Sequence, residues 1–165
     1  MNPKLYWIDS PWKGKLAISA RPRGGDWLED DVKGWRKAGI GAVFSLLTPE
    51  ELPDLGLSDE KELSERESLR FFSLPIPDRR VPASNAAASV VLRNVQQILW
   101  RRERMWRSIA ARAFGRSGMI AAALLTAQGV SPSDALHRVS AARGWDVPET
   151  DEQRAWVMQM AGAGV

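Results

Sequence analysis

Short apolar runs alternate along this chain with longer segments that carry helix-boundary residues. Gly41 to Leu47 has the sequence GAVFSLL, and an apolar run of this length predicts a buried strand. Further strands are predicted at Lys4 to Ile8, Lys15 to Ser19 and Leu69 to Ile76. The alternation of strands and helices predicts an α/β domain with a mostly parallel central sheet flanked by helices. In such sheets a ligand binds at the carboxyl ends of the strands.

Capping residues and glycines mark the predicted helices. Asp26 is predicted to cap a helix that ends near Ala38, and Thr48-Pro49-Glu50-Glu51 is typical of a helix start. The other predicted helices span Asp59 to Ser68, Ser84 to Leu99, Ser117 to Gln128, Pro132 to Arg143 and Thr150 to Ala161. With 165 residues and no linker or internal repeat, we predict a single domain over residues 1–165.

The chain contains no cysteine and one histidine. The missing cysteines exclude disulfides and thiolate metal sites, and one histidine does not support a multi-histidine metal centre, so no metal site is predicted. Its longest strongly apolar stretch, Met119 to Leu125, is too short to cross a bilayer. Because the amino terminus also lacks the apolar run of a signal peptide, we expect a cytoplasmic protein.

The positive charge of the chain is concentrated in one segment. The net charge is +3, but Trp100 to Phe114 holds five arginines and one glutamate, which is a local charge of +4. Without this segment the chain is slightly acidic. One interpretation is that an Arg- and Trp-rich helix from Leu92 to Arg107 forms an anion-binding module for nucleic acid or an acidic membrane.

The sequence Gly115-Arg116-Ser117-Gly118 opens an apolar helix. Glycines before a helix allow backbone N–H groups to converge on an anion, and the helix amino terminus favours negative charge there. Arg116 adds a guanidinium that can hold a phosphate with two hydrogen bonds. Taken alone, these four residues fit a loop with a surface arginine equally well.

A second motif, Pro75 to Pro82, has the sequence PIPDRRVP. Three prolines within it predict a stiff, extended loop after a strand. Asp78 stands where such a loop can present a carboxyl group to a cleft. An aspartate in a turn, without a chemical role, is the alternative interpretation.

Taken in order, these features resemble the cysteine-dependent protein tyrosine phosphatase superfamily, and within it the small bacterial dual-specificity-type phosphatases. The shared order is a strand, a proline-rich loop with an aspartate, a long helix, and Gly-Arg-Ser-Gly before a further helix. The resemblance covers nearly the whole chain. It includes Ala20 to Leu28 (ARPRGGDWL), Ser45 to Thr48 with Glu50 and Glu51, and Val147 to Gln153 (VPETDEQ).

The chain departs from the family pattern at the nucleophile. That pattern is His-Cys, five residues, Arg, and then Ser or Thr, so counting back from Arg116 places the cysteine at Ala110. Ile109 replaces the histidine, and Ala113 replaces an expected glycine. The positions that the resemblance assigns to phosphate binding are Ala111, Arg112, Ala113, Phe114, Gly115 and Arg116.

The same segment also lacks the buried strand that should precede the loop, which suggests a local reading-frame error. Suppose that the reading frame is shifted so that each codon begins with the last base of the preceding one, starting from the last base of the Leu99 codon. With third bases that the genetic code permits, Trp100 to Phe114 then become VAAGEDVAFHCRAGI. One superfluous base at Phe114 then restores the frame at Gly115. Met105 and Trp106 have single codons, and together they force a valine. The segment's charge changes from +4 to −1 and the chain's from +3 to −2, with a cysteine at position 110.

The resemblance implies a role for each matching residue in the frame-restored loop. A thiolate at position 110 attacks phosphorus, while Arg116 and the loop amides hold the phosphoryl oxygens. Asp78 acts as general acid and then as general base, and Ser117 hydrogen-bonds the sulfur. Gln153 either helps to place the attacking water or is an exposed helical glutamine.

Three functions remain open at this point. A frame error predicts hydrolysis of phosphomonoesters, on protein phosphotyrosine, phosphoserine or phosphothreonine or on a small phosphoester, through a phosphocysteine. The present sequence instead predicts a catalytically dead pseudophosphatase that binds phosphorylated partners, and the Arg- and Trp-rich module is the third function. The family resemblance implies no metal or organic cofactor, no nucleic-acid partner and no membrane partner.

Overall fold

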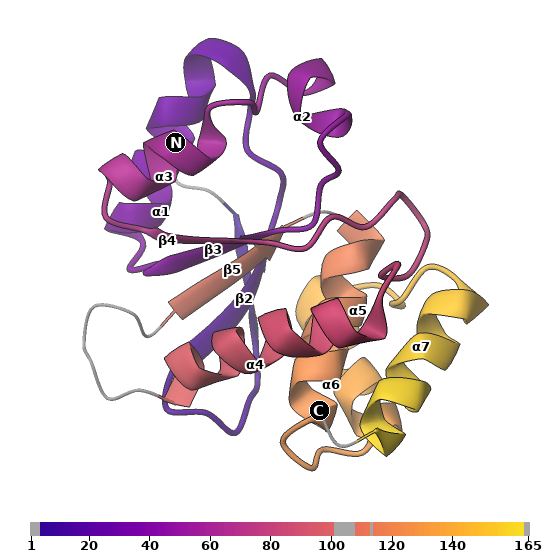
Figure 1. Ribbon diagram of the computed structural model, residues 1–165. Helices are drawn as coiled ribbons and strands as arrows, with labels where there is room; N and C mark the ends of the chain where they lie inside the picture. The colour runs from indigo at the N-terminus through magenta and orange to yellow at the C-terminus, as the bar shows by residue number, and fades with distance from the viewer. Residues whose placement is uncertain (1–3, 101–107, 113, 164–165) are drawn as a thin grey trace.

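In the part of the chain that the structure describes, five strands form the central sheet: β1 (Leu5–Ile8), β2 (Lys15–Ser19), β3 (Ala42–Ser45), β4 (Arg70–Ser73) and β5 (Ser108–Arg112). The computed structural model describes residues 4–100, 108–112 and 114–163. The strand order is β1-β2-β5-β3-β4 (Figure 1). β1 pairs antiparallel with β2, and the other three pairings are parallel. The predicted α/β fold with a mostly parallel sheet is therefore confirmed.

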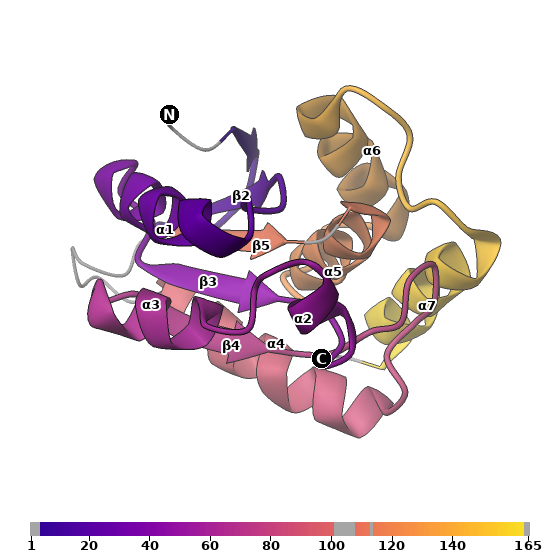
Figure 2. The same ribbon diagram turned by 90° about the horizontal axis from the view of Figure 1, so that it is seen from above.

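Helices cover both faces of this sheet. They are α1 (Leu28–Lys37), α2 (Glu51–Asp54), α3 (Glu60–Arg66), α4 (Asn85–Trp100), α5 (Phe114–Thr126), α6 (Pro132–Arg143) and α7 (Asp151–Gly162), with a 3₁₀ turn η1 (Gly25–Trp27) before α1. Figure 1 shows α1 and α3 on one face and α4 to α7 on the other. Seen from above, α2 overlaps the end of β3 and the start of α5 (Figure 2), and Glu51 at the start of α2 is hydrogen-bonded to Arg116 in the first turn of α5.

The core lies on both sides of the sheet, and α5 is its central helix. All residues from Met119 to Leu125 are buried, because β2 and β5 contact one side of α5 while α6 and α7 contact the other. On the opposite face, Trp35 of α1 is fully buried, and its Nε1 donates a hydrogen bond to Ser19 Oγ at 3.1 Å. A helix enclosed in this way needs apolar residues on all sides, which is the composition that this segment has.

Several predicted boundaries are confirmed, and others need correction. α6 matches its prediction, with Ser131 Oγ accepting from the Asp134 N–H and Gly144 in the left-handed conformation at the carboxyl end. The prediction for Asp26 is wrong, because it lies inside the 3₁₀ turn and no side chain caps α1. β3 and β4 are also shorter than predicted, since their last predicted residues already belong to the loops that form the cleft.

β5 occupies the centre of the sheet, between β2 and β3. Ile109 lies opposite Leu16 and Ala42, and Ala110 lies opposite Ala17 and Val43. A strand at this position has both faces covered and therefore favours uncharged residues. Ser108 to Ala111 is the longest uncharged run between residues 100 and 114, which explains why the strand forms there. The predicted Arg- and Trp-rich helix coincides with α4 as far as Trp100. Its remaining residues, 101–107, lie outside the described residues.

Candidate active site

The carboxyl ends of the parallel strands meet at one edge of the sheet, and the segments that follow them surround a cavity of about 290 Å³. The lining residues come from the segment after β2, from α2 and the residues on either side of it, from the loop after β4 and from the first turn of α5. They are Arg21, Leu47, Glu51, Asp54, Leu55, Asp78 and Arg116. This cavity thus lies at the edge where a parallel sheet is expected to bind its ligand.

Arg116, in the first turn of α5, is 6% exposed and lines this cavity. Its Nη1 lies 2.9 Å from Glu51 Oε2, and its Nη2 lies 2.9 Å from Glu51 Oε1. Nη1 also donates to the carbonyl oxygens of Ile76 and Leu46. Segments after β3 and β4 therefore fix the guanidinium of a residue that follows β5.

Glu51 lines the cavity and holds Arg116, a role that its sequence pattern does not indicate. Its pattern, Thr-Pro-Glu-Glu, predicted a helix start, and its carboxylate does accept a 2.8 Å hydrogen bond from the Thr48 N–H. The partner that gives it a second role, Arg116, lies 65 positions away in sequence, so no local signal indicates the pair. Hydrogen bonds from Arg116 lower the pKa of Glu51, against a smaller opposing effect of burial.

This lowered pKa predicts a pH-dependent contribution to stability. The folded-state pKa of Glu51 lies below the ordinary value of about 4.3, so its stabilisation is complete above that pH and is lost as pH falls through the folded-state pKa. We expect Glu51→Gln to lower the free energy of unfolding by about 2 kcal/mol at pH 7, and by less at pH 3. Urea titrations at both pH values measure this.

Glu62 provides the matched control for that experiment, because its carboxylate pairs with Arg66 on the exposed surface of α3. Glu62→Gln should change the free energy of unfolding by less than about 0.5 kcal/mol. An equal effect of the Glu51 and Glu62 substitutions, or a Glu51→Gln effect that does not shrink at low pH, would contradict the assigned role of the Glu51–Arg116 pair.

The structure brings Asp78 to the same cavity. Asp78 Oδ1 lies 3.8 Å from Arg116 Nη2, and its side chain is 71% exposed. It stands in the loop between β4 and α4, which the prolines at 75, 77 and 82 stiffen. Asp78 and Arg116, predicted from two separate motifs, are therefore neighbours in space.

Ser117 and Gln153 are both buried. Ser117 follows Arg116 in α5 and is 1% exposed. The alternative of an exposed helical glutamine is wrong for Gln153, which is fully buried in α7 and donates a 3.1 Å hydrogen bond from Nε2 to the Arg80 carbonyl oxygen. Gln153 thus holds the loop that carries Asp78, and the segment match around it was the only sequence signal for this.

The predicted nucleophile position lies in the middle of β5. Ala110, Ala111 and Arg112 are strand residues, and Phe114 is the first residue of α5. Ala113, the one position between strand and helix, lies outside the described residues. Gly115 is buried, and its N–H donates to Glu149 Oε1 at 3.3 Å. The phosphate-binding roles assigned to residues 111–115 stay a prediction.

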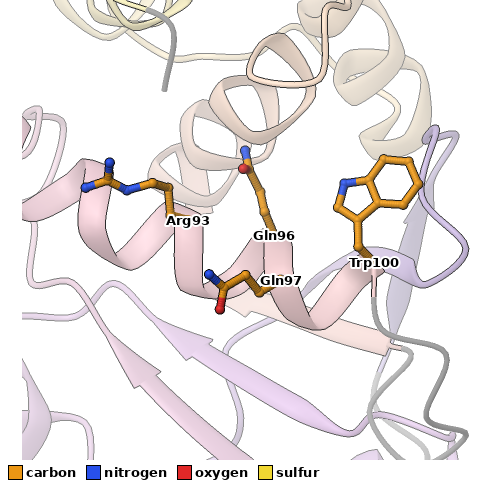
Figure 3. A pocket seen from close by; sticks show the side chains of 4 residues that line it. All are labelled: Arg93, Gln96, Gln97 and Trp100. Carbon is orange, nitrogen blue, oxygen red and sulfur yellow. The ribbon is translucent and has the colours of Figure 1, made fainter.

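A larger cavity, of about 480 Å³, lies away from this site along α4. Its lining residues are Arg93, Gln96, Gln97 and Trp100, whose side chains follow one another along the helix (Figure 3). Trp100 Nε1 donates to Gln128 Oε1 at 3.0 Å. None of the residues predicted for phosphate chemistry lines this cavity.

Over residues 4–100, 108–112 and 114–163, no helix has both the length and the apolar character needed to cross a bilayer. Within the same ranges, no group of three or more His, Cys, Asp or Glu side chains is placed to hold a metal ion.

Comparison with known proteins connects this geometry to phosphatases. No protein-family model matches the chain, and no curated protein sequence matches it significantly. Among solved structures, kinase-associated phosphatase, in a form whose catalytic-site cysteine is replaced by serine, has a TM-score of 0.86 and 19% identity, with 99% of this chain and 97% of that chain covered.

The active form of Tk-PTP has a TM-score of 0.73 and 27% identity, with both chains covered completely. A putative phosphatase from Shewanella putrefaciens has a TM-score of 0.64 and 15% identity, with 96% of this chain and 92% of that chain covered. This chain therefore has the fold of the dual-specificity and tyrosine phosphatases, but contains no cysteine to serve as their nucleophile.

Proposed function

We propose that this protein binds phosphomonoesters in the Arg116 cavity and, when position 110 carries the cysteine of the restored reading frame, hydrolyses them through a phosphocysteine. One observation carries the proposal. A buried arginine at the start of α5 is fixed by Glu51 and lies 3.8 Å from the predicted general acid Asp78, at the carboxyl edge of a phosphatase-like sheet.

The hydrogen bonds of Arg116 leave one side of its guanidinium for the phosphoryl group. A guanidinium has five N–H donors arranged as an end-on pair and a side-on pair. Glu51 takes the end-on pair, Nη1 and Nη2. Nε is buried and has no partner among the described residues. The side-on donors are thus the ones that we assign to the phosphoryl oxygens, while Glu51 acts as the positioning residue for Arg116.

In the frame-restored chain the reaction has two steps. The thiolate at position 110 attacks phosphorus, the bond from phosphorus to the leaving oxygen breaks, and Asp78 donates its proton to that oxygen. Water then attacks the phosphocysteine as Asp78 accepts a proton from it, the S–P bond breaks, and inorganic phosphate leaves. Arg116 stabilises the phosphoryl oxygens in both steps.

The role of Asp78 can be tested in the frame-restored chain with two substrates. We expect Asp78→Asn to lower kcat about 100-fold for an alkyl phosphate, whose leaving oxygen needs a proton, and much less for 4-nitrophenyl phosphate. Steady-state kinetics measure both. The exposed Asp9→Asn, on the loop after β1, is the control and should change neither rate. Equal loss on both substrates would contradict general-acid catalysis by Asp78.

In the present chain no covalent step is available, because the sequence has no cysteine. The same cavity then supports the alternative of a pseudophosphatase, which holds a phosphorylated partner without hydrolysing it. Binding of phenyl phosphate, measured by isothermal titration calorimetry, supports both forms of the proposal. Absence of binding would favour the Arg- and Trp-rich module, for which salt-sensitive binding of unrelated DNA is the corresponding test.

A further inference from the structure

Arg21 is a second arginine on the same cavity, and the proposed chemistry does not use it. It lies just after the carboxyl end of β2, is exposed, and lines the cavity together with Arg116 and Asp78. Among the described residues it has no ion pair or hydrogen bond through its side chain. Arg116, in contrast, is held by a carboxylate and two carbonyl oxygens.

The neighbouring Arg23, unlike Arg21, has partners for its guanidinium. The Arg23 guanidinium donates to the Asp31 carboxylate through Nε and Nη2. Its central carbon also lies over the Trp27 ring, 4.9 Å from the ring centroid. Pro22, between the two arginines, is buried. In the Arg-Pro-Arg sequence, one arginine therefore holds the loop in place while the other lines the cavity.

The loop that carries Arg21 is fixed to α1 and to the turn that follows α2. The Arg23 N–H donates to Asp31 Oδ2 at 2.7 Å, and the Gly25 N–H donates to the Gly56 carbonyl oxygen at 2.9 Å. At Gly24 the backbone approaches so closely that a Cβ would lie 1.8 Å from the Leu55 carbonyl oxygen. The Arg21 backbone is thus held beside the turn that supplies Asp54 and Leu55, which lowers the entropy cost of using Arg21 in binding.

We propose that Arg21 binds a second anionic group of the substrate, so that the preferred substrates are phosphomonoesters with another phosphate or a carboxylate next to the scissile phosphate. This inference rests on the proposed function. Arginine is suited to both groups because its planar donors match their oxygens. Of the three carboxylates that line the cavity, Glu51 is neutralised by Arg116 and Asp78 lies 3.8 Å from the same guanidinium, which leaves Asp54 as the one that opposes a second anion most.

A matched ligand series tests the proposal on the present chain, which binds without turnover. The probes are phenyl phosphate, 2-carboxyphenyl phosphate and benzene-1,2-diyl bisphosphate, which differ only in the group beside the phosphate. Calorimetry should show that the second anion strengthens binding about tenfold, the equivalent of one charge-assisted contact. The carboxylate and bisphosphate arms show which of the two anions is preferred.

Substitutions then assign the gain to Arg21. Arg21→Gln should remove the gain while leaving the Kd of phenyl phosphate within about twofold, and Asp54→Asn should increase the gain by a few-fold. Arg93→Gln, an arginine on the distant α4 cavity, is the matched control and should change none of the three values. Circular dichroism confirms that each variant is folded.

The failures of the two proposals are distinguishable. Equal binding of all three ligands, or an equal loss for all three in Arg21→Gln, would overturn the role of Arg21 and leave the phosphate site intact. If none of the ligands binds, both proposals fail. If the two doubly anionic ligands bind to Arg116→Ala as tightly as to the parent chain, the assigned phosphate site fails while Arg21 remains an anion-binding residue.

Discussion

Replacing residues 100–114 with VAAGEDVAFHCRAGI is expected to convert an inactive polypeptide into a phosphatase. The frame-restored chain should hydrolyse 4-nitrophenyl phosphate with a burst of nitrophenol, whereas the present chain should not exceed the buffer rate. Loss of a catalytic nucleophile costs about 10⁴-fold to 10⁶-fold in kcat, so the difference is easily measured. The rate of nitrophenol release, followed by absorbance, is the measurement.

A single substitution provides the control for this result. Ala110→Cys in the present chain should stay inactive, because Ala110 lies within β5 and the two positions after it are also strand residues. Over the described residues 108–112 the backbone is a strand paired with its neighbours, not a loop whose N–H donors converge on a thiol and lower its pKa. Activity of Ala110→Cys, or a folded frame-restored chain without activity, would contradict our interpretation of this segment.

Loss of Arg116 should have the second large effect. We expect Arg116→Ala to weaken phenyl phosphate binding by about 100-fold, since the side-on donors and the cavity's buried positive charge disappear together. Arg116→Lys should recover little of this affinity, because an ammonium keeps the charge but not the planar pair of donors. Calorimetric titration of each variant measures the Kd.

Arg138 offers a control for the Arg116 variants. Its Nη2 pairs with Asp134 on α6, and its Nη1 lies 3.8 Å from Asp9 Oδ2. Arg138→Ala should leave the Kd of phenyl phosphate unchanged. If Arg116→Ala binds phenyl phosphate as tightly as the parent chain while remaining folded, the cavity around Arg116 is not the phosphate site.

Local signals in the sequence were sufficient for much of the fold. Ser131-Pro132 at one end of α6 and Gly144 at the other are strong boundary residues, and the structure places the helix between them. Asp26 carried the same kind of signal but lies in a 3₁₀ turn. There the close backbone contact between Gly24 and Leu55 determines how the chain enters α1, and that contact joins segments 31 positions apart.

The candidate site was predictable only where a motif marked it. Asp78 and Arg116 each stand in a recognisable pattern, and the topology of the sheet brings them together. Glu51 was missed because its partner comes from a different part of the chain, and Glu149 was missed because its contact with the Gly115 N–H crosses from the segment before α7 to the start of α5. Pairings of this kind depend on tertiary structure, so no spacing rule indicates them.

The segment from 100 to 114 is where the local sequence and the fold disagree. The phosphatase pattern has an uncharged central strand followed by an anion-binding loop, while the sequence between residues 100 and 114 has five arginines and no cysteine. β5 consists of the uncharged run Ser108 to Ala111 followed by Arg112, and its last three positions are ones that the family pattern assigns to the nucleophile and the loop. Both flanks of the segment fit the phosphatase pattern, which is why we locate the problem in the reading frame.

Independent sequencing of the source gene across codons 98 to 116, on both strands, tests this account most directly. Relative to the coding sequence that gives the present chain, we predict one additional base near codon 99 and one base fewer near codon 114. Together these two differences place a cysteine codon at position 110. If the gene instead encodes Trp100 to Phe114 as in the present chain, the nucleophile is truly absent. That result would contradict the assignment of this protein as an active phosphatase.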